Sequence, residues 1–376
     1  MAKFATNKVQ YGIRLADPFG ESIKNIDSFI SIEYARKVND IGSMTLVLPD
    51  EYPPYLFAID SRLEVWRGYP SNLKLDMDTI WLIRKVADVI DKDGTRQYQI
   101  TAYDALHLLK RRIVPYNDGN PESQKQDWAD DMCKEIVYEN LGAGAADVNR
   151  DLSAWLSIDA DFGAAPQATK LFSRRIVMEV LQEIAQSSYD NGTFLAFDLV
   201  YDPIGRRLTF KTYTGQRGVD RSGSGNSKLV IVGENYNGIL SASLTFDHEE
   251  EYNYIYAAGQ SVGDIVAIYE IGDDAAIGKS PFNRCEFLQN ASGTDDADEL
   301  KEEAKAALSQ YKAKTILQCE IDALAKGSEY GIDFGYGDKI AIEFGGKSYN
   351  VLVNAISVKV DGADEQVSAV LSNVTD

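Results

Sequence analysis

The chain has 376 residues, of which 44% are hydrophobic and 26% are charged, and its 58 acidic against 38 basic residues give a net charge of -20. This composition predicts a globular protein of two or three domains with a sizeable core, and it excludes disordered and fibrous proteins. Because an acidic surface repels a polyanion, we expect no tight binding of nucleic acid.

The sequence contains no recognisable targeting or membrane segment. The first ten residues lack an apolar core of signal-peptide length, and no run approaches the roughly 18 apolar residues of a membrane span. We therefore expect synthesis and folding in the cytoplasm, without membrane insertion. The three cysteines, Cys133, Cys285 and Cys319, include no close pair, which favours buried thiols over a metal or redox site.

Residues 1–112 predict a first domain built mainly of strands. Apolar and polar residues alternate over Ile30–Tyr34, and Gly42–Pro49 ends at a proline, which cannot donate to a central ladder. A long apolar stretch at Ile80–Ile90 predicts another strand. A short helix over Asp104–Arg112 then leaves the sheet, with basic residues at its C-terminal end.

Residues 113–222 predict a peripheral α+β domain. Apolar residues recur at helical spacing over Trp128–Leu141, which Gly142 is placed to cap, and again over Ile176–Ile184. Two strand-like stretches within Phe194–Tyr213 flank a turn and predict a hairpin.

Residues 223–376 predict a second β domain, interrupted by a loop-rich insertion at about 262–295. A helix follows the insertion, with its apolar stripe running from Leu300 to Tyr311. The closing segment, Gly335–Asn373, alternates apolar and polar residues in runs separated by glycine-containing turns. This pattern predicts an antiparallel meander.

The closing meander has a counterpart in the first domain. Trp81–Asp91 aligns with Val351–Asp361 without a gap, and Ser61–Gly68 resembles Gly337–Gly345 in pattern. Any two meanders share some of this pattern, so coincidence and duplication both remain open. A duplication predicts two related small barrels.

We accordingly expect Arg62–Asp104 to superpose on Asp338–Asn373 in separate sheets. A single continuous sheet shared by both stretches would refute the duplication.

The two histidines do not suggest catalysis. His107 lies among leucines, as a packed histidine does, and His248 opens an acidic run that favours a solvated turn. Consecutive strand residues point to opposite faces, so His248 and the acids after it do not converge on one ion. No Gly-x-Ser-x-Gly motif stands before a helix.

Other candidate motifs are also weak. The stretch Gly272–Ser280 resembles a phosphate-binding loop, but it has five residues between its glycines instead of four, and Pro281 stands where a helix should begin. The acidic pairs Asp159 with Asp161 and Asp76 with Asp78 are more typical of loops than of a glycosidase site. We therefore assign no catalytic, cofactor-binding or metal-binding residue and expect no enzyme activity and no cofactor.

Four stretches spread over nearly the whole chain carry a resemblance to a known family, although none of them carries chemistry. They are Asn39–Pro49, Tyr103–Val114, Tyr252–Gln260 and Tyr336–Ile342. Their order resembles that of the tail hub, or baseplate hub, proteins at the tip of long-tailed bacteriophages. The match is to an architecture.

The resemblance implies a structural virion protein at the tail tip, with two related tube-like β-barrel hub domains and an intervening α+β domain. It implies a homotrimer that presents six barrels to a six-fold tail tube and a three-fold axis to a fibre or spike, with DNA passing through. Residues 113–222 would project outside this ring. The implied partners are the distal tail ring, the tape measure and the central fibre or spike, and any lytic activity is expected on a separate protein.

Two other functions stay open. One is a wall-degrading hydrolase of the tail tip. The other is a receptor-binding or carbohydrate-binding module, which could use exposed rings among the 21 tyrosines.

Overall fold

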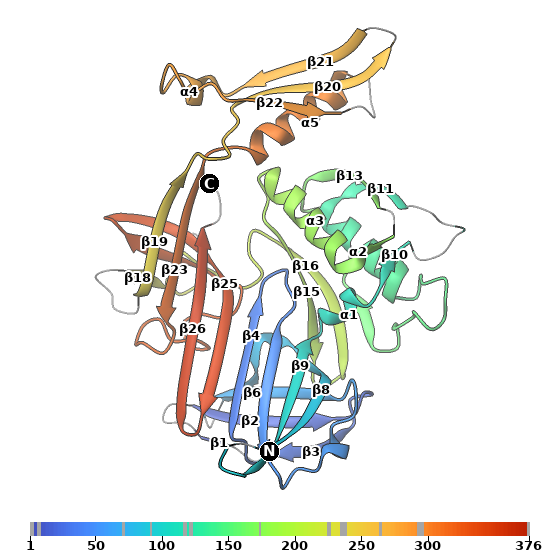
Figure 1. Ribbon diagram of the computed structural model, residues 1–376, viewed down its shortest axis with the longest axis vertical. Helices are drawn as coiled ribbons and strands as arrows, with labels where there is room; N and C mark the ends of the chain where they lie inside the picture. Colours follow the sequence, from blue (N-terminus) through green and yellow to red (C-terminus); the bar gives the residue numbers. More distant parts are fainter. Residues whose placement is uncertain are drawn as a thin grey trace.

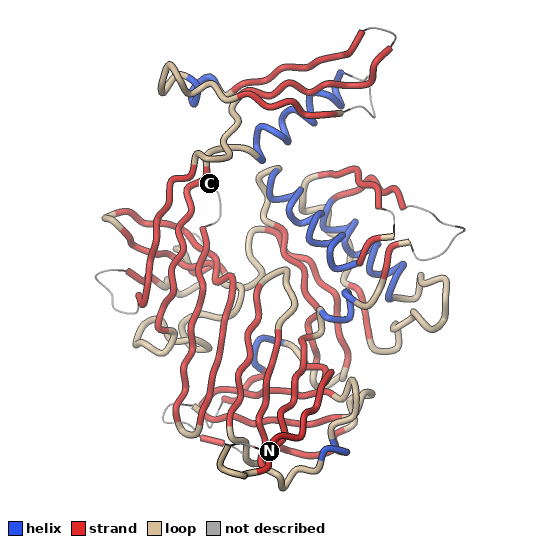
Figure 2. The backbone as a smooth tube through the Cα atoms, viewed as in Figure 1, coloured by secondary structure: helices blue, strands red, loops and turns tan. Residues whose placement is uncertain are grey.

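The computed structural model describes residues 4–5, 9–69, 72–90, 92–115, 119, 123–172, 174–223, 227–233, 239–262, 265–291 and 297–373. Strands predominate, and most helices lie in the middle of the chain and in a small unit at one end of the molecule (Figure 1, Figure 2). The predicted mainly β, α+β class is confirmed. Within the described residues, no helix is long and apolar enough to cross a membrane.

The largest sheet has 16 strands, contributed by both ends of the chain. Its strands from the first part are β1 (Phe4–Ala5), β2 (Gln10–Ala16), β3 (Ser22–Ile26), β4 (Ser31–Lys37), β5 (Ser43–Pro49), β6 (Arg62–Tyr69), β7 (Asn72–Leu75), β8 (Trp81–Ile90) and β9 (Arg96–Asp104). Those from the last part are β17 (Asp220–Arg221), β18 (Ile231–Gly233), β19 (Ile239–Asp247), β23 (Lys314–Asp322), β24 (Lys339–Phe344), β25 (Lys347–Asp361) and β26 (Asp364–Asn373). The short 3-10 helices η1 (Pro54–Leu56) and η2 (Asp76–Asp78) connect strands of the first part.

The middle of the chain forms a separate α+β unit, called the middle unit below. Its elements are α1 (His107–Lys110), β10 (Ile113–Val114), β11 (Ser123–Trp128), α2 (Ala129–Leu141), β12 (Leu156–Ile158), β13 (Gln167–Phe172), β14 (Arg175–Ile176), α3 (Val177–Asp190), β15 (Leu195–Asp202) and β16 (Arg207–Thr214). The predicted helices and hairpin are confirmed. Helices α2 and α3 bury their apolar faces against each other and against the hairpin β15–β16 in one core.

A small tip unit, at the top of Figure 1, stands between β19 and β23 in the chain. Its elements are β20 (Tyr254–Val262), β21 (Ile265–Gly272), α4 (Asp274–Ile277), β22 (Glu286–Asn290) and α5 (Ala297–Gln310). Residues 262–295 were expected to be loop-rich, and this expectation is wrong, because β21 and β22 pair on either side of β20. Strand β22 is short, and a turn, the helix α4 and Pro281 separate it from β21, so its pairing with β20 is a tertiary contact.

The first and last parts of the chain share one hydrophobic core. Buried residues from β2 to β9 and from β18 to β26 belong to a single cluster, whereas the middle and tip units have clusters of their own. The alternation in β4 shows how the sequence produces this core. Ile32, Tyr34 and Arg36 are buried, while Glu33 and Lys37 on the opposite face are exposed.

The strand order of the first part is repeated in the last part. Five strands of the first repeat are neighbours in the order β6, β8, β9, β5, β4, and five strands of the second repeat are neighbours in the order β24, β25, β26, β23, β19. Equivalent strands also occur in the same order along the chain. The tip unit is an insertion between the first two strands of the second repeat.

The registers of the two repeats also correspond. Trp81 pairs with Asp104 in the first repeat, and Val351 pairs with Asn373 in the second. A β-bulge interrupts the first pairing between Ile83 and Lys85, and the second between Val353 and Ala355. These are equivalent positions in the gapless sequence alignment. A meander does not require a bulge, and a bulge bends its strand locally. A bulge at the same aligned position in both copies therefore supports their equivalence more strongly than the meander pattern does.

The turn that enters the third strand of each repeat is the same as well. Asp60 has φ 62° and Gly337 has φ 77°. The Asp60 N–H donates to the Ile83 carbonyl at 2.9 Å, and the Gly337 N–H donates to the Val353 carbonyl at 3.1 Å. The left-handed conformation of a non-glycine residue at Asp60 is uncommon, so its recurrence at Gly337 supports a common backbone plan.

The two repeats do not form separate barrels. Strand β4 of the first repeat pairs with residues Ala355–Asp361 of β25, called the outer half of β25 below, so both meanders belong to one continuous sheet. The prediction of two barrels in separate sheets is therefore wrong, and the shared sheet refutes a duplication of that form. The physical reason is the length of β25, whose first residues pair with β24 while its outer half remains free to accept β4. What the first and last parts of the chain have in common is the order of their strands and the register of their pairing.

We predict that Ile356→Ala destabilises the whole sheet, because Ile356 is fully buried where β4 meets the outer half of β25. Truncating a buried isoleucine costs about 2 to 5 kcal/mol of unfolding free energy. Lys359→Ala, at an exposed position of the same strand, should stay within about 0.5 kcal/mol of the wild type. Chemical denaturation measures both, and equal losses for the two variants would contradict the shared core.

Candidate functional site

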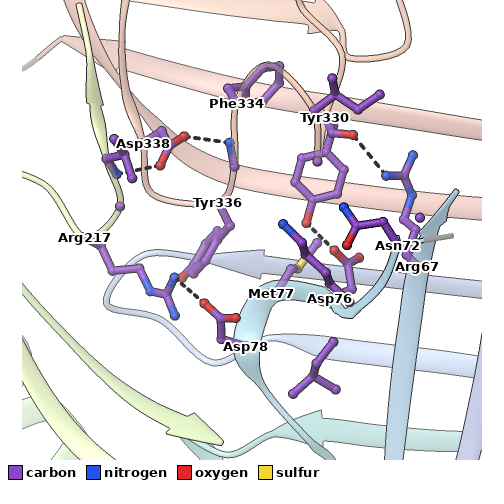
Figure 3. Close-up of a pocket in the computed structure, with 18 of the residues that line it drawn as sticks. Arg67, Asn72, Asp76, Met77, Asp78, Arg217, Tyr330, Phe334, Tyr336 and Asp338 are labelled. Atoms are coloured by element: carbon purple, nitrogen blue, oxygen red, sulfur yellow. Dashed lines mark hydrogen bonds and ion pairs between the residues drawn. The ribbon is translucent and has the colours of Figure 1, made fainter. Parts of the chain in front are cut away.

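A cavity of about 520 Å³ opens where the two repeats and the segment after the middle unit meet (Figure 3). Polar groups from all three parts line it. The labelled ones in Figure 3 are Arg67, Asn72, Asp76, Asp78, Arg217, Tyr330, Tyr336 and Asp338, with Met77 and Phe334 as apolar neighbours. Charged and polar side chains converge in it, which makes it the first candidate for a functional site.

A buried ion network lies beside this cavity. Arg36 donates from Nε to Asp104 Oδ2 at 2.7 Å and from Nη2 to Asp198 Oδ1 at 2.6 Å, and all three side chains are buried. Arg217 donates from Nε to the second oxygen of Asp198 at 2.9 Å. The network joins β4 and β9 of the first repeat to β15 of the middle unit.

Aromatic and backbone groups complete the network. The guanidinium groups of Arg36 and Arg217 each lie 4.9 Å from the ring centroid of Tyr336. Arg36 also donates to the Met77 carbonyl at 2.7 Å. These contacts satisfy charges that would otherwise be costly to remove from water.

The two carboxylates of the network have opposite pKa shifts. Burial raises the pKa of Asp104 to about 6, although Arg36 opposes the shift. Burial also acts to raise the pKa of Asp198, but Arg36 and Arg217 together overcome it and hold that pKa below its ordinary value. Asp198 is therefore the ionised partner of both arginines.

Asp76 holds the second repeat against the first. Its two oxygens accept hydrogen bonds from Tyr34 Oη and Tyr330 Oη, both at 2.6 Å. Loss of water around the carboxylate raises its pKa, and Arg67 and the two hydroxyls oppose this shift. Asp78 is more exposed and lies 3.3 Å from Arg217. The pair was expected to be loop residues, but Asp76 and Asp78 form the 3-10 helix η2 and serve as contacts between segments.

Arg67 and Asp338 make two further links. Arg67 Nε donates to Glu365 of β26 at 2.8 Å, and its Nη1 donates to the Tyr330 carbonyl at 3.1 Å. Asp338 accepts from the Val219 amide at 2.6 Å and pairs with Arg221 at 2.8 Å. The cavity walls are thus bound to each other by charged groups.

This arrangement is a structural joint. Among the described residues that line the cavity there is no histidine, cysteine or serine. Its carboxylates already bind partners from neighbouring segments. The site can hold segments in register, and we assign it no chemistry.

The two histidines lie apart from the cavity. His107 is half-buried, stacks on Tyr103 at 4.8 Å between ring centroids, and accepts from Arg111 at 3.0 Å. Burial and the Arg111 cation lower the pKa of His107 to about 4. His248 is exposed, and its Nδ1 lies 2.6 Å from Glu251. Each histidine is in the kind of local setting that its sequence predicted.

The cysteines and the remaining acids also lie apart. Cys133 and Cys319 are buried, whereas Cys285 is only partly buried and departs from the prediction. Burial raises the pKa of Cys133, and it raises that of Cys319 to about 11. Asp159 and Asp161 lie in an irregular segment after β12, as expected. Searching the described residues found no group of three potential metal ligands.

The rejected phosphate-loop motif forms the start of α4. The Asp273 side chain accepts from the backbone amides of Ala275 and Ala276 at 3.1 and 3.0 Å. These are the amides that a phosphate would need at such a helix start. The protein's own carboxylate uses them.

Sequence reasoning missed the members of the ion network. One signal was available at Arg36, which occupies an inward-facing position after Ile32 and Tyr34 in an alternating strand. A charge on the apolar face of a strand requires a buried partner. Its partners, Asp104 and Asp198, are 68 and 162 residues away along the chain, so no local pattern could identify them.

We predict that Arg36→Met destabilises the protein by about 3 to 5 kcal/mol, because it leaves two buried carboxylates with one cation. The loss should be larger at pH 7 than at pH 5. Without Arg36 the pKa of each carboxylate rises above its wild-type value, so the variant binds protons at a pH where the wild type stays ionised. Denaturation at pH 7 and pH 5 measures the difference.

The matched control is Arg175→Met, which removes an exposed ion pair with Glu183. It should cost less than about 1 kcal/mol. A loss in Arg36→Met that is small or independent of pH would contradict the ion network.

Solved structures with a similar fold include three that are described as tail proteins. The chain is similar to the crystal structure of the tail protein from Neisseria meningitidis MC58, at 12% identity and TM-score 0.58, covering 96% of each chain. It is similar to the 43 kDa tail protein of prophage MuSo2 from Shewanella oneidensis, at 12% identity and TM-score 0.59, covering 97% of this chain and 98% of that one. Prophage tail protein gp18 from Listeria monocytogenes EGD-e gives 12% identity and TM-score 0.53, covering 97% and 95%.

These matches show the fold, and the resemblance to phage tail proteins noted from the sequence is confirmed together with a family model. A comparison with curated proteins found no match. The family model for Siphovirus ReqiPepy6 Gp37-like protein matches residues 12–371, nearly the whole chain. The chain therefore belongs to the Siphovirus ReqiPepy6 Gp37-like protein family.

Proposed function

We propose that this protein is a trimeric hub at the tip of a phage tail, a structural virion component that adapts a six-fold tail tube to a three-fold fibre or spike. The repeat of strand order and register within one chain carries the proposal. A chain with two equivalent units supplies six such units in three copies. The distal tail ring, the tape measure and the central fibre or spike are its proposed neighbours.

A ring is the assembly that the repeat favours. Two equivalent units joined side by side within a chain define a rotation, and repeating that rotation between chains closes a ring of fixed size. A rotation near one sixth of a turn requires three chains. The free sheet edges of each chain also need covering, because exposed edges invite uncontrolled pairing.

The hydrolase alternative finds less support. The polar cavity holds its carboxylates in ion pairs and hydrogen bonds between segments, and the two histidines lie elsewhere. A turnover assay on peptidoglycan separates this alternative from the structural role.

The receptor-binding alternative rests on the tip unit. Helix α5 packs on the β20–β21–β22 sheet, and the opposite face exposes Ile268 and Leu288 beside Tyr256. Apolar and aromatic side chains on an exposed face are typical of a surface that binds a partner. A glycan array separates carbohydrate binding from contact with another tail protein.

We expect the purified protein at high concentration to have three times the chain mass of 41.6 kDa. Native mass spectrometry or light scattering measures this directly. As a control, a peptide tag can be inserted beside Val148, which is exposed in the α2–β12 connection. This tag leaves the sheet edges untouched, so the tagged protein should still have the mass of three chains. A stable monomer or dimer at high concentration would contradict the proposed hub.

We also expect no measurable binding of duplex DNA at moderate salt. A passage meant for transit should repel DNA or stay neutral, whereas a basic lining would hold it by releasing counterions. The net charge of -20 supports this expectation. Fluorescence anisotropy with a labelled duplex tests it, and tight binding that weakens steeply with salt would contradict it.

A further inference from the structure

We propose that the chain binds a second copy of itself by pairing the free edge of β19 with the outer half of β8 (Lys85–Ile90), repeating between chains the joint that β4 and β25 make within one chain. The inference rests on the proposed function, because it names the contact that closes the ring. It is argued from the two repeats alone.

The proposed contact between chains is based on the pairing of β4 with the outer half of β25 within one chain. Residues Ser31–Lys37 of β4 pair antiparallel with the outer half of β25, Ala355–Asp361. Ala35 stands opposite Ser357, and Tyr34 stands opposite Val358. The joint is therefore an edge of the first repeat laid against a strand of the second.

Each partner in this joint has an equivalent in the other repeat. β19 occupies the place of β4, because it pairs with β23 as β4 pairs with β5. The outer half of β8 occupies the place of the outer half of β25, because it follows the equivalent bulge. The second repeat thus offers β19 as a free edge strand equivalent to β4. The first repeat offers the outer half of β8 as a strand with which it can pair, equivalent to the outer half of β25.

Both equivalents are unpaired on the relevant edge. Among the described residues, β6 pairs with β8 only at Trp81 and Leu82, so the outer half of β8 has β9 on one side and no strand on the other. Strand β19 ends the order of the sheet, and within the described part of the chain it pairs only with β23. In Figure 1, β19 lies at the left border and β8 low on the right, so the two edges lie on opposite sides of one molecule.

Burial differs between the repeats where this neighbour is missing. Val360 and Ile32, which face each other in the internal joint, are both 0% exposed. Their equivalents are Ile90, which is 68% exposed, and Ile239 at the bulged end of β19, which is partly exposed. Pairing β19 with β8 would place Ile90 opposite Ile239 and remove both side chains from water.

The internal joint also fixes the register between chains. Transferred through the equivalent pairings, Ala87 stands opposite Ser243, Val86 opposite Leu244, and Asp88 opposite Ala242. The strands run antiparallel, as in the internal joint. A head-to-tail contact of this kind differs from two copies of β19 pairing with each other, which would give a two-fold dimer.

The test is a cysteine pair across the predicted contact. In a Cys285→Ser background, the double variant Ala87→Cys with Ser243→Cys should form disulfides between chains on oxidation, giving linked dimers and trimers on a non-reducing gel. Directly opposed strand residues lie close enough for a bridge. A matched control, Ala35→Cys with Ser357→Cys, should form the equivalent bridge within one chain.

A register control is Ala87→Cys with Ser241→Cys, which should cross-link at least tenfold less, because Ser241 is predicted opposite Val89. A trimer by native mass in which the internal control bridges but Ala87 and Ser243 do not would overturn this contact and leave the hub intact. Linked dimers from Ser243→Cys alone would overturn it in favour of β19 pairing with itself. A monomer at every concentration would overturn both the contact and the proposed hub.

Discussion

The pairing of β4 with the outer half of β25 is the constraint on which the rest of the structure depends. It joins strands that are more than 300 residues apart into one sheet and gives the first and last parts of the chain a common core. It also turns Tyr34 and Arg36 toward the interior, where they bind Asp76, Asp104 and Asp198. The polar cavity and the position of the middle unit both follow from that one antiparallel pairing.

The buried charges give this joint its geometry. Two arginines and two aspartates removed from water are costly unless each finds several partners at short distance. Here Asp198 is bound by two guanidinium groups, and Tyr336 lies against both of them. Such a network tolerates little displacement, so it fixes the middle unit against the sheet more strictly than apolar contact would.

Local patterns in the sequence predicted the strands of the two meanders, the helices α2, α3 and α5, and the alignment of Trp81–Asp91 with Val351–Asp361. That alignment even matches the two bulges. The shared sheet could not be predicted, because strand period says which face of β4 is buried and nothing about which distant strand it pairs with. The short strands of the tip unit and the partners of Arg36 escaped prediction for the same reason, since both depend on distant segments.

The central claim is that one chain carries two equivalent units which, repeated between chains, make a hub ring. Cryo-electron microscopy of the assembled protein tests this most directly. The account predicts a ring of three chains with six similar lobes, in which the contact between chains repeats the β4–β25 joint within each chain. A two-fold assembly, or a ring in which the contacts within and between chains are unlike, would contradict it.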